Sequence, residues 1–343
     1  MALRLWFNQA YRGTYQLIGM LRQAGGRDGL DLHVTGSHTA VSTPFLQACD
    51  TAFPEPEDLV GEQWVEFALR TCRERDIDVY VPGREREAVD EAADRFAAAG
   101  VKLMVSPAAA VRTLGDKGLA HESALALGLP VARTIVVTDA AGFRAAYETL
   151  RGEGLRVCMK PAVDHGAKGF RILDDAVGSW ADLQEVPGPH IHPDDVERRI
   201  VAQGTVAPLL VTEYLAGDEI SIDTLSHEGD LLAAVPRSKG GPEWTRTLVD
   251  DVDALEIAAT VSKGYGLRYL SNVQVRRGAD GAARLLEVNT RAASGLFQSA
   301  ASGLNLPYLA LRLLLDGRVE VPAPRLGATV ISYNEAFEAV LPW

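Results

Sequence analysis

Short apolar runs alternate with longer amphipathic segments through the first hundred residues, and this alternation constrains the fold more than any other feature of the chain. The apolar runs have the length of strands and occupy residues 3–7, 32–35, 51–53, 79–81 and 103–105. The segments between them repeat apolar residues at helical spacing and occupy residues 14–23, 59–75 and 85–99. A strand–helix–strand rhythm predicts βαβ units and a small parallel sheet, with a ligand site outside the carboxyl ends of its strands.

The pattern changes after residue 107, where a helix, a strand, a second helix and a pair of strands follow. We place them at residues 116–127, 134–137, from 139 onward, 157–159 and 170–173. The last two strands surround a loop that contains glycine, which predicts a lid-like hairpin. The polar, proline-containing residues 174–192 predict a loop between two lobes.

From residue 209 the sequence predicts a long antiparallel meander with two helices. The strands are placed at residues 209–215, 220–225, 231–236, 270–276 and 285–288, and the helices at 252–265 and 307–315. The tail after residue 327 has strand character at 328–332, and we expect it to pack back on a lobe. The prediction is therefore an α/β chain in three parts, with boundaries at residues 1–106, 107–190 and 191–343.

Charge and composition narrow the class of protein. The 343 residues carry a net charge of −12, which argues against nucleic-acid binding because phosphate backbones are held by clustered Lys and Arg. The three cysteines are widely spaced and form no CxxC pair, so they predict reduced thiols in a cytoplasmic protein. No apolar run is long enough for a signal peptide or a bilayer span, and we expect no membrane partner.

Common catalytic signatures are absent, and the informative polar residues lie at strand ends. No GxGxxG follows the first strand, no GK dipeptide supplies a P-loop lysine, and neither HExxH nor GxSxG occurs. In the strand at residues 285–291, alternation places Glu287, Asn289 and Arg291 on one face. With Gln274 from the preceding strand, these oxygen donors suit Mg²⁺. The alternative is the solvated polar face of a hairpin.

Two further segments carry polar groups that fit a nucleotide. Lys160 interrupts an apolar strand, so its ammonium is expected to face a partner such as a phosphate, which the loop at residues 166–169 would cover. The alternative is an ordinary hairpin with a surface lysine. Residues 212–219 run from an apolar strand into a polar turn, which can present backbone groups to an adenine edge and a carboxylate to ribose hydroxyls.

The order of these segments resembles that of the ATP-grasp superfamily, and of its carbamoyl-phosphate-synthase-like branch in particular. Over roughly residues 77 to 316, five separated segments agree, at Asp116-Lys117, Lys160 with its glycine loop, residues 213–219, Gln274, and residues 287–291. The resemblance implies a Rossmann-like N-terminal lobe followed by a two-lobed ATP-grasp domain with antiparallel sheets.

The resemblance also implies a role for each matching residue. The residues similar to those that bind ATP are Lys117 and Lys160 at the phosphates, the covering loop from Gly166 to Gly169, Glu213, Tyr214 and Leu215 at adenine, and Glu219 at ribose. The residues that match the metal ligands are Gln274, Glu287 and Asn289, for Mg²⁺ with Mn²⁺ as the alternative. Lys168 would add a cation over the triphosphate, and Arg291 matches the arginine beside the γ-phosphate and the acyl phosphate.

One departure from the family pattern and one further match concern the site. Thr290 replaces the commoner proline between Asn289 and Arg291. The side chains of Asn289 and Arg291 are still expected on the same face. Arg237 and Lys239 fall where family members often carry basic residues near the acceptor. We expect Arg237 to act in catalysis, whereas a surface role for Lys239 is an equal alternative.

The activity implied is that of an ATP-dependent carboxylate–amine ligase, which forms an acyl phosphate, passes it to an amine (or a thiol), and releases ADP and phosphate. The alternatives are a bicarbonate-activating carboxylase or carbamoyl-phosphate-type enzyme, and a non-catalytic ATP-binding regulatory protein. The partners are then a small carboxylate and an amine, and a homodimer is compatible with the superfamily. Arg12, Arg84 and Arg86 follow strands, where they could hold an anionic substrate or lie on the surface.

Overall fold

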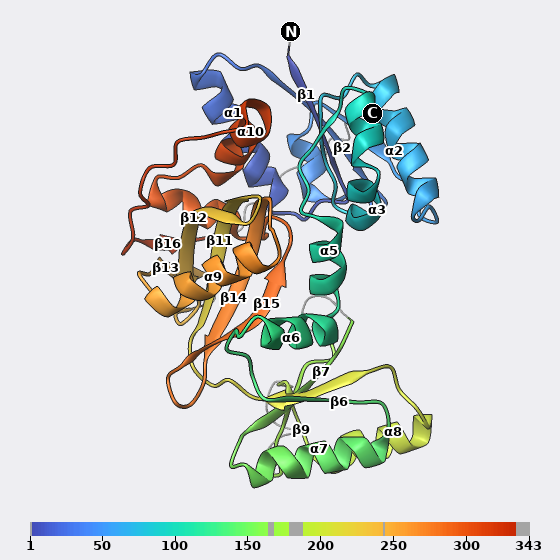
Figure 1. Cartoon of the computed structure of the whole chain (residues 1–343), viewed down its shortest axis with the longest axis vertical. Helices are drawn as coiled ribbons and strands as arrows, with labels where there is room; N and C mark the ends of the chain where they lie inside the picture. Colours follow the sequence, from blue (N-terminus) through green and yellow to red (C-terminus); the bar gives the residue numbers. More distant parts are fainter. Residues whose placement is uncertain (1, 164–167, 178–187, 243, 334–343) are drawn as a thin grey trace. The chain divides into compact units, whose positions relative to one another are not determined.

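A computed structural model describes residues 2–163, 168–177, 188–242 and 244–333 of the chain (Figure 1). The chain forms two compact units. The first comprises Met1–Leu114, Glu219–Gln274 and Glu287–Trp343, and the second comprises Gly115–Asp218 and Val275–Leu286. None of the described helices is long and apolar enough to cross a membrane.

The first unit begins with the parallel sheet that the alternating pattern predicted. Its strands lie in the order β3-β2-β1-β4-β5 and are β1 (Leu3–Asn8), β2 (Leu32–His38), β3 (Thr51–Pro54), β4 (Val79–Val81) and β5 (Lys102–Leu103). The helices of this part are α1 (Thr14–Arg27), η1 (Pro44–Ala48), α2 (Glu62–Glu74), α3 (Arg86–Glu91), α4 (Ala93–Ala98) and α5 (Ala108–Gly115). The single helix expected at residues 85–99 is divided at Ala92, whose backbone (φ −95°, ψ 15°) leaves the helical conformation.

A six-stranded sheet follows in the order β15-β14-β11-β12-β13-β16. It belongs to the first unit except for residues 275–277 of β14 and 283–286 of β15, which are assigned to the second unit. Its strands are β11 (Glu219–His227), β12 (Asp230–Ser238), β13 (Thr245–Leu248), β14 (Tyr269–Arg277), β15 (Ala283–Asn289) and β16 (Thr329–Ile331), and its helices are α9 (Val252–Gly264), η3 (Leu296–Ser302) and α10 (Leu306–Asp316). β11, β12, β13 and β16 pair antiparallel in succession. The described part of the tail, which contains β16, therefore packs back on this sheet as predicted. β16 pairs with β13, a strand that was not predicted from the sequence.

The second unit is built on a five-stranded sheet in the order β6-β10-β7-β8-β9. Its elements are α6 (Lys117–Ala126), β6 (Thr134–Val137), α7 (Ala140–Gly152), β7 (Val157–Pro161), β8 (Arg171–Leu173), β9 (His190–Ile191), α8 (Pro193–Gln203) and β10 (Leu209–Glu213). The Asp116 carboxylate caps α6 by accepting from the Gly118 and Leu119 amides, and Asp139 caps α7 by accepting from the Gly142 amide. β7 and β8 form the predicted hairpin.

One strand was assigned to the wrong sheet from the sequence. Residues 209–215 were assigned to the meander, but β10 pairs antiparallel with both β6 and β7 in the second unit. Val211 of β10 is buried in the core of the second unit. That unit therefore supplies both the core against which β10 packs and the two strands to which it is hydrogen-bonded. The second unit extends to Asp218, and the predicted boundary at residue 190 stays a prediction. Helix α8, whose first turn begins His192-Pro193, was not predicted either.

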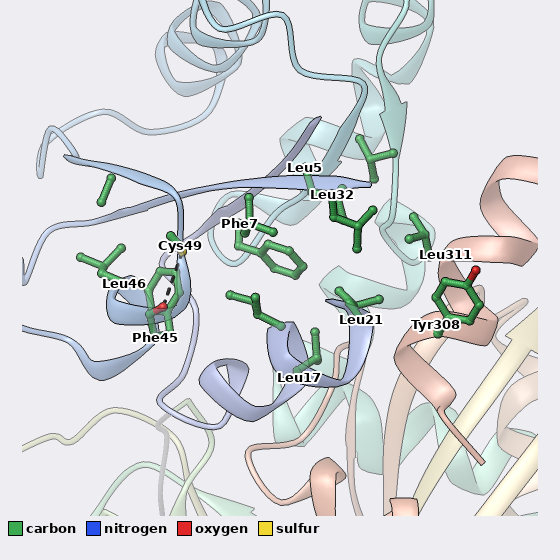
Figure 2. Packing of buried hydrophobic residues seen from close by; sticks show 14 residues of the cluster. Leu5, Phe7, Leu17, Leu21, Leu32, Phe45, Leu46, Cys49, Tyr308 and Leu311 are labelled. Atoms are coloured by element: carbon green, nitrogen blue, oxygen red, sulfur yellow. Dashed lines mark hydrogen bonds between the residues drawn. The ribbon is translucent and has the colours of Figure 1, made fainter. Parts of the chain in front are cut away.

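The parallel sheet shares a core with the last helix of the chain. Leu5 and Phe7 of β1, Leu17 and Leu21 of α1, and Leu311 of α10 belong to one buried cluster (Figure 2). Tyr308 of α10 also belongs to it, and its hydroxyl donates to the Asp28 carboxylate at 2.6 Å. Residues nearly 300 positions apart therefore fix this face of the sheet, which is one wall of the cavity described below.

Burial makes all three cysteine thiols unreactive in the folded chain. Burial raises the pKa of Cys49, Cys72 and Cys158 to about 12 in each case, so about one thiol in 10,000 is ionised at pH 8. We expect iodoacetamide at pH 8 to label the native protein at less than about 1% of the rate found in guanidinium chloride, as measured by mass spectrometry. Fast labelling of any one cysteine in the native protein would show that its surroundings open.

Candidate active site

The end of β15 presents the residues of the predicted metal site. Glu287, Asn289 and Arg291 are half-buried, whereas Val288 and Thr290 between them are buried, which is the alternation that the sequence predicted. Among the described residues, neither the Glu287 carboxylate nor the Asn289 amide has a hydrogen-bond or ion-pair partner. A half-buried carboxylate without a partner is available to a cation. No group of three His, Cys, Asp or Glu side chains is arranged for a metal in the described part of the chain, so Glu287 would need amide and phosphate oxygens to complete a shell.

Buried hydrogen bonds orient the amide of Gln274 on the neighbouring strand β14. The Nδ2 of Asn272 donates to the Asp223 carboxylate at 2.9 Å and to the Ile222 carbonyl at 3.2 Å. Both partners can only accept, so the Oδ1 of Asn272 must be turned the other way, where it accepts from Nε2 of Gln274 at 3.1 Å. The Oε1 of Gln274 is therefore the oxygen left for a ligand. β14 and β15 are neighbours in the sheet, and the role of Gln274 in metal binding stays a prediction.

Arg237 lies at the centre of the same buried network. Its guanidinium is 3% exposed, forms an ion pair with the fully buried Asp223 at 2.8 Å, and donates to Oε1 of Gln298 at 2.8 Å. Asp223 also accepts from the Ser299 hydroxyl at 2.6 Å. These contacts assign Arg237 a structural position, and a direct catalytic role for it stays a prediction. Lys239 forms an ion pair with Glu219, the residue predicted at ribose.

Two arginines lie together where β15 approaches the parallel sheet. Nη1 of Arg86 donates to the carbonyl and the hydroxyl of Thr290, at 2.8 and 2.7 Å. The next residue, Arg291, places its guanidinium 3.9 Å from the centre of the Tyr11 ring. Burial, and then the charge of Arg291, lower the pKa of Arg86 to about 10, which leaves it charged at neutral pH. Neither arginine is paired with a carboxylate among the described residues.

The sequence alone did not separate these arginines from their neighbours. Arg86 was one of three candidates for anion binding, and the structure distinguishes them. Arg12 is exposed, whereas Arg84 donates to the carbonyls of Pro56, Glu57 and Leu59. Thr290, which departs from the family pattern, provides the hydroxyl that holds Arg86. The sequence signal for Arg86 was its place in the segment that follows β4, and Arg84 lies in the same segment. Only the contacts in the structure therefore show which arginine is left for an anion.

The second unit contains the residues predicted at the ATP phosphates. The Lys117 amide donates to the Ala162 carbonyl at 3.0 Å, which joins the start of α6 to the end of β7. Lys160 lies on β7 opposite Leu210 of β10. Its charge contributes, after burial, to the lowered pKa of His121 on α6, so the two side chains lie within electrostatic reach of each other. Both lysines make further contacts of their own.

The covering loop is described only in part. Gly166 lies outside the described residues, so its predicted role is untested. Lys168 is exposed, in keeping with a side chain free to reach a ligand. Gly169 has φ +69°, and a Cβ there would lie 2.7 Å from Cγ of Pro161. Only glycine fits this turn without strain.

The segment predicted at adenine follows β10. The Tyr214 amide donates to the Arg156 carbonyl at 2.7 Å, and the centre of the Tyr214 ring lies 4.8 Å from the Arg156 guanidinium and 5.4 Å from that of Arg276. The Glu213 side chain lies 3.6 Å from the Arg284 guanidinium, so its carboxylate supports the strand end. The amide of the buried Leu215 makes no hydrogen bond to any described residue, which leaves it available to an adenine nitrogen.

Comparison with known proteins identifies the fold. The biotin carboxylase domain of 2-oxoglutarate carboxylase from Hydrogenobacter thermophilus matches 96% of this chain and 73% of its own length, with a TM-score of 0.67 and 14% identity. That structure is a dimer in complex with MgADP, ADP and bicarbonate. L-amino acid ligase from Bacillus licheniformis matches 91% of this chain and 74% of its own length, with a TM-score of 0.63 and 17% identity. The chain has the fold that these proteins share.

The sequence comparisons find one family model over part of the chain and distant relatives. A family model described as "ATP-grasp in the biosynthetic pathway with Ter operon" matches residues 205–336. The carbamoyl phosphate synthase large chain of Streptomyces avermitilis is 26% identical over 277 residues, which is 71% of this chain and 23% of that protein. The chain spans about a fifth of the length of the carbamoyl phosphate synthases it matches. The resemblance to the ATP-grasp superfamily that the order of the motifs predicted is therefore confirmed.

Proposed function

We propose that this protein is an Mg·ATP-dependent ligase that activates a carboxylate as an acyl phosphate and transfers the acyl group to an amine. The observation that carries the proposal is the end of β15, where a carboxylate with no partner among the described residues, an amide and an arginine follow one another on one face. The fold, the family model over residues 205–336 and the C–N ligase among the similar structures support it.

The residues of the site fit ATP and Mg²⁺. Glu287, Asn289 and the free oxygen of Gln274 are hard oxygen donors, and one carboxylate with two amides leaves room for phosphate oxygens in the shell of the metal. The protein has a net charge of −12, so its overall charge does not neutralise a triphosphate. When bound, Mg²⁺ would neutralise part of the phosphate charge locally. Lys117 and Lys160 would hold the phosphates, and the free Leu215 amide would bind adenine.

The remaining residues position the reacting groups. A carboxylate is a poor electrophile at neutral pH, and a phosphoryl group converts one of its oxygens into a leaving group. Charge on the transferred phosphoryl group is spread over its oxygens, so placed cations stabilise the transition state. Arg291, two residues after Asn289, would be such a cation. The amine then attacks the acyl carbon, the C–O bond to phosphate breaks, and the proton of the amine leaves with solvent or phosphate. This chemistry requires no protein nucleophile.

Trapping the acyl phosphate tests the proposal. Full-length protein is incubated with Mg·ATP, hydroxylamine and single carboxylates, including amino acids, simple aliphatic acids and bicarbonate. We expect hydroxamate and ADP to form in equal amounts with at least one organic acid, because hydroxylamine takes the place of the amine. Mass spectrometry of the hydroxamate identifies the acid.

Three outcomes separate the alternatives. ADP release that depends on bicarbonate and gives no organic hydroxamate would replace the proposal by a bicarbonate-activating enzyme. Tight Mg·ATP binding with no ADP release under any condition would favour a regulatory protein. Failure to bind ATP would overturn the proposal as a whole.

A further inference from the structure

The first unit contains a cavity at the carboxyl ends of β1 and β4. Its volume is about 80 Å³, several times the ~10–15 Å³ that a single water needs. The apolar wall is formed by the buried side chains of the shared core, including Leu5, Phe7, Leu17, Leu21 and Leu311 (Figure 2). Every lining residue belongs to the first unit, so the cavity is complete within it.

The charged groups of the cavity all have one sign. Arg86, Arg268 and Arg291 line it, and no Asp or Glu of the described residues does, although the chain has 46 acidic residues against 34 basic ones. Arg268 is paired with Asp90, which is not a lining residue, and its buried Nε has no partner among the described residues. Arg86 and Arg291 have no carboxylate partner in the described part of the chain. The cavity therefore offers unpaired donors beside an apolar wall.

The arginines are fixed before any ligand arrives. Arg86 is held by two hydrogen bonds to Thr290, and Arg291 by the Tyr11 ring and a hydrogen bond of 3.1 Å to the Ala292 carbonyl. Each guanidinium has five N–H groups, so most remain for a ligand. Two like charges held together in a half-buried place repel each other, and an anion between them removes this repulsion. Thr290 and Arg291 directly follow Asn289, so the polar end of the cavity adjoins the residues predicted to bind the metal.

We propose that this cavity binds the carboxylate substrate, and that the substrate is a monocarboxylate with a compact apolar tail and no ammonium group. The inference rests on the proposed function and names the substrate class of that site. The carboxylate lies against Arg86 and Arg291, next to the residues where it would be phosphorylated. The tail lies against the leucines of the wall, where its burial contributes about 25 cal/mol per Å² of apolar surface.

The absence of acidic lining residues decides against an α-amino acid. An ammonium group on the α-carbon would enter beside two guanidinium groups with no lining carboxylate to meet it, and burying an unpaired charge is costly. A second carboxylate in place of the tail would lie against apolar side chains. A long acyl chain exceeds the volume. The amine substrate must therefore bind elsewhere.

Isothermal titration of the full-length protein with matched acids tests the proposal without any turnover. The probes are 4-methylpentanoate, leucine, which has the same skeleton with an added ammonium group, and glutarate. We expect 4-methylpentanoate to bind at least about tenfold more tightly than either of the others. Arg86→Met should weaken its binding by about 10- to 100-fold, because charge-assisted hydrogen bonds are lost, and Ala10→Leu should weaken it by filling the cavity. Arg73→Met, an exposed arginine of α2, is the matched control.

Each outcome decides the question. Leucine or glutarate binding as tightly as 4-methylpentanoate would overturn the inference, and so would unchanged affinity in a folded Arg86→Met variant. If circular dichroism shows that Arg86→Met is unfolded, the comparison of the three probes on the natural protein still decides. Tight binding of 4-methylpentanoate with no hydroxamate formed from any acid would instead contradict the proposed function and leave the cavity as a carboxylate site.

Discussion

Replacement of Glu287 by Gln is expected to lower the rate of ADP formation by about 100- to 1,000-fold, the loss typical when one charge-stabilising group is removed from an active site. Glutamine keeps the shape of the side chain and one oxygen but removes the only negative charge in the predicted metal set of Gln274, Glu287 and Asn289. The Mg²⁺ concentration needed for half-maximal activity should rise in the same variant, because a neutral oxygen is a weaker ligand. Both quantities come from a coupled ADP assay over a range of Mg²⁺ concentrations.

The matched control is Glu256→Gln, which removes an exposed carboxylate from α9 in the same unit. It should change neither the rate nor the Mg²⁺ dependence. If Glu287→Gln keeps full activity at low Mg²⁺, the end of β15 is not the metal site. If the Glu287→Gln variant is less stable, its urea midpoint will be lower, and the half-buried carboxylate then has a structural role.

Replacement of Arg237 by Met is expected to lower the free energy of unfolding by ~3–5 kcal/mol, the usual result of breaking a buried ion pair. Asp223 is fully buried and would lose the cation that compensates its charge. Asp223 also accepts a hydrogen bond from Asn272, and Asn272 in turn orients Gln274. We therefore expect the variant to need a higher Mg²⁺ concentration as well. Urea unfolding followed by circular dichroism measures the first effect.

The double variant Asp223→Leu with Arg237→Met separates charge from packing. Removing both partners of a buried pair is often nearly neutral, so much of the lost stability should return, whereas the orientation of Gln274 should not. Arg318→Met, at an exposed position of the same unit, is the control and should be within about 0.5 kcal/mol of the natural protein. If Arg237→Met unfolds like the control, the ion pair contributes no net stability. If the double variant regains activity too, the network does not orient the site.

The sequence predicted local structure well where periodicity and capping agree. The parallel strands of the first hundred residues, the helix capped by Asp116 and the strand that carries Glu287, Asn289 and Arg291 follow from side-chain period and from turn residues. Strand β10 was misplaced because its apolar run fits either neighbouring sheet, and local sequence does not say which strands supply its hydrogen bonds. Helix α8 was missed because the prolines around it were interpreted as a loop.

The sequence by itself determined the class of fold and the order of the polar segments, because periodicity and spacing are properties of neighbouring residues. Only the tertiary structure decided which charges are used within the fold and which remain for a ligand. Arg237 lies near the end of β12 and Arg86 follows β4, yet Arg237 is paired with Asp223 in the core, and Arg86 faces a cavity that no described acidic residue lines. Partners at separations such as 204 residues, between Arg86 and Thr290, depend on chain packing, which no local pattern encodes.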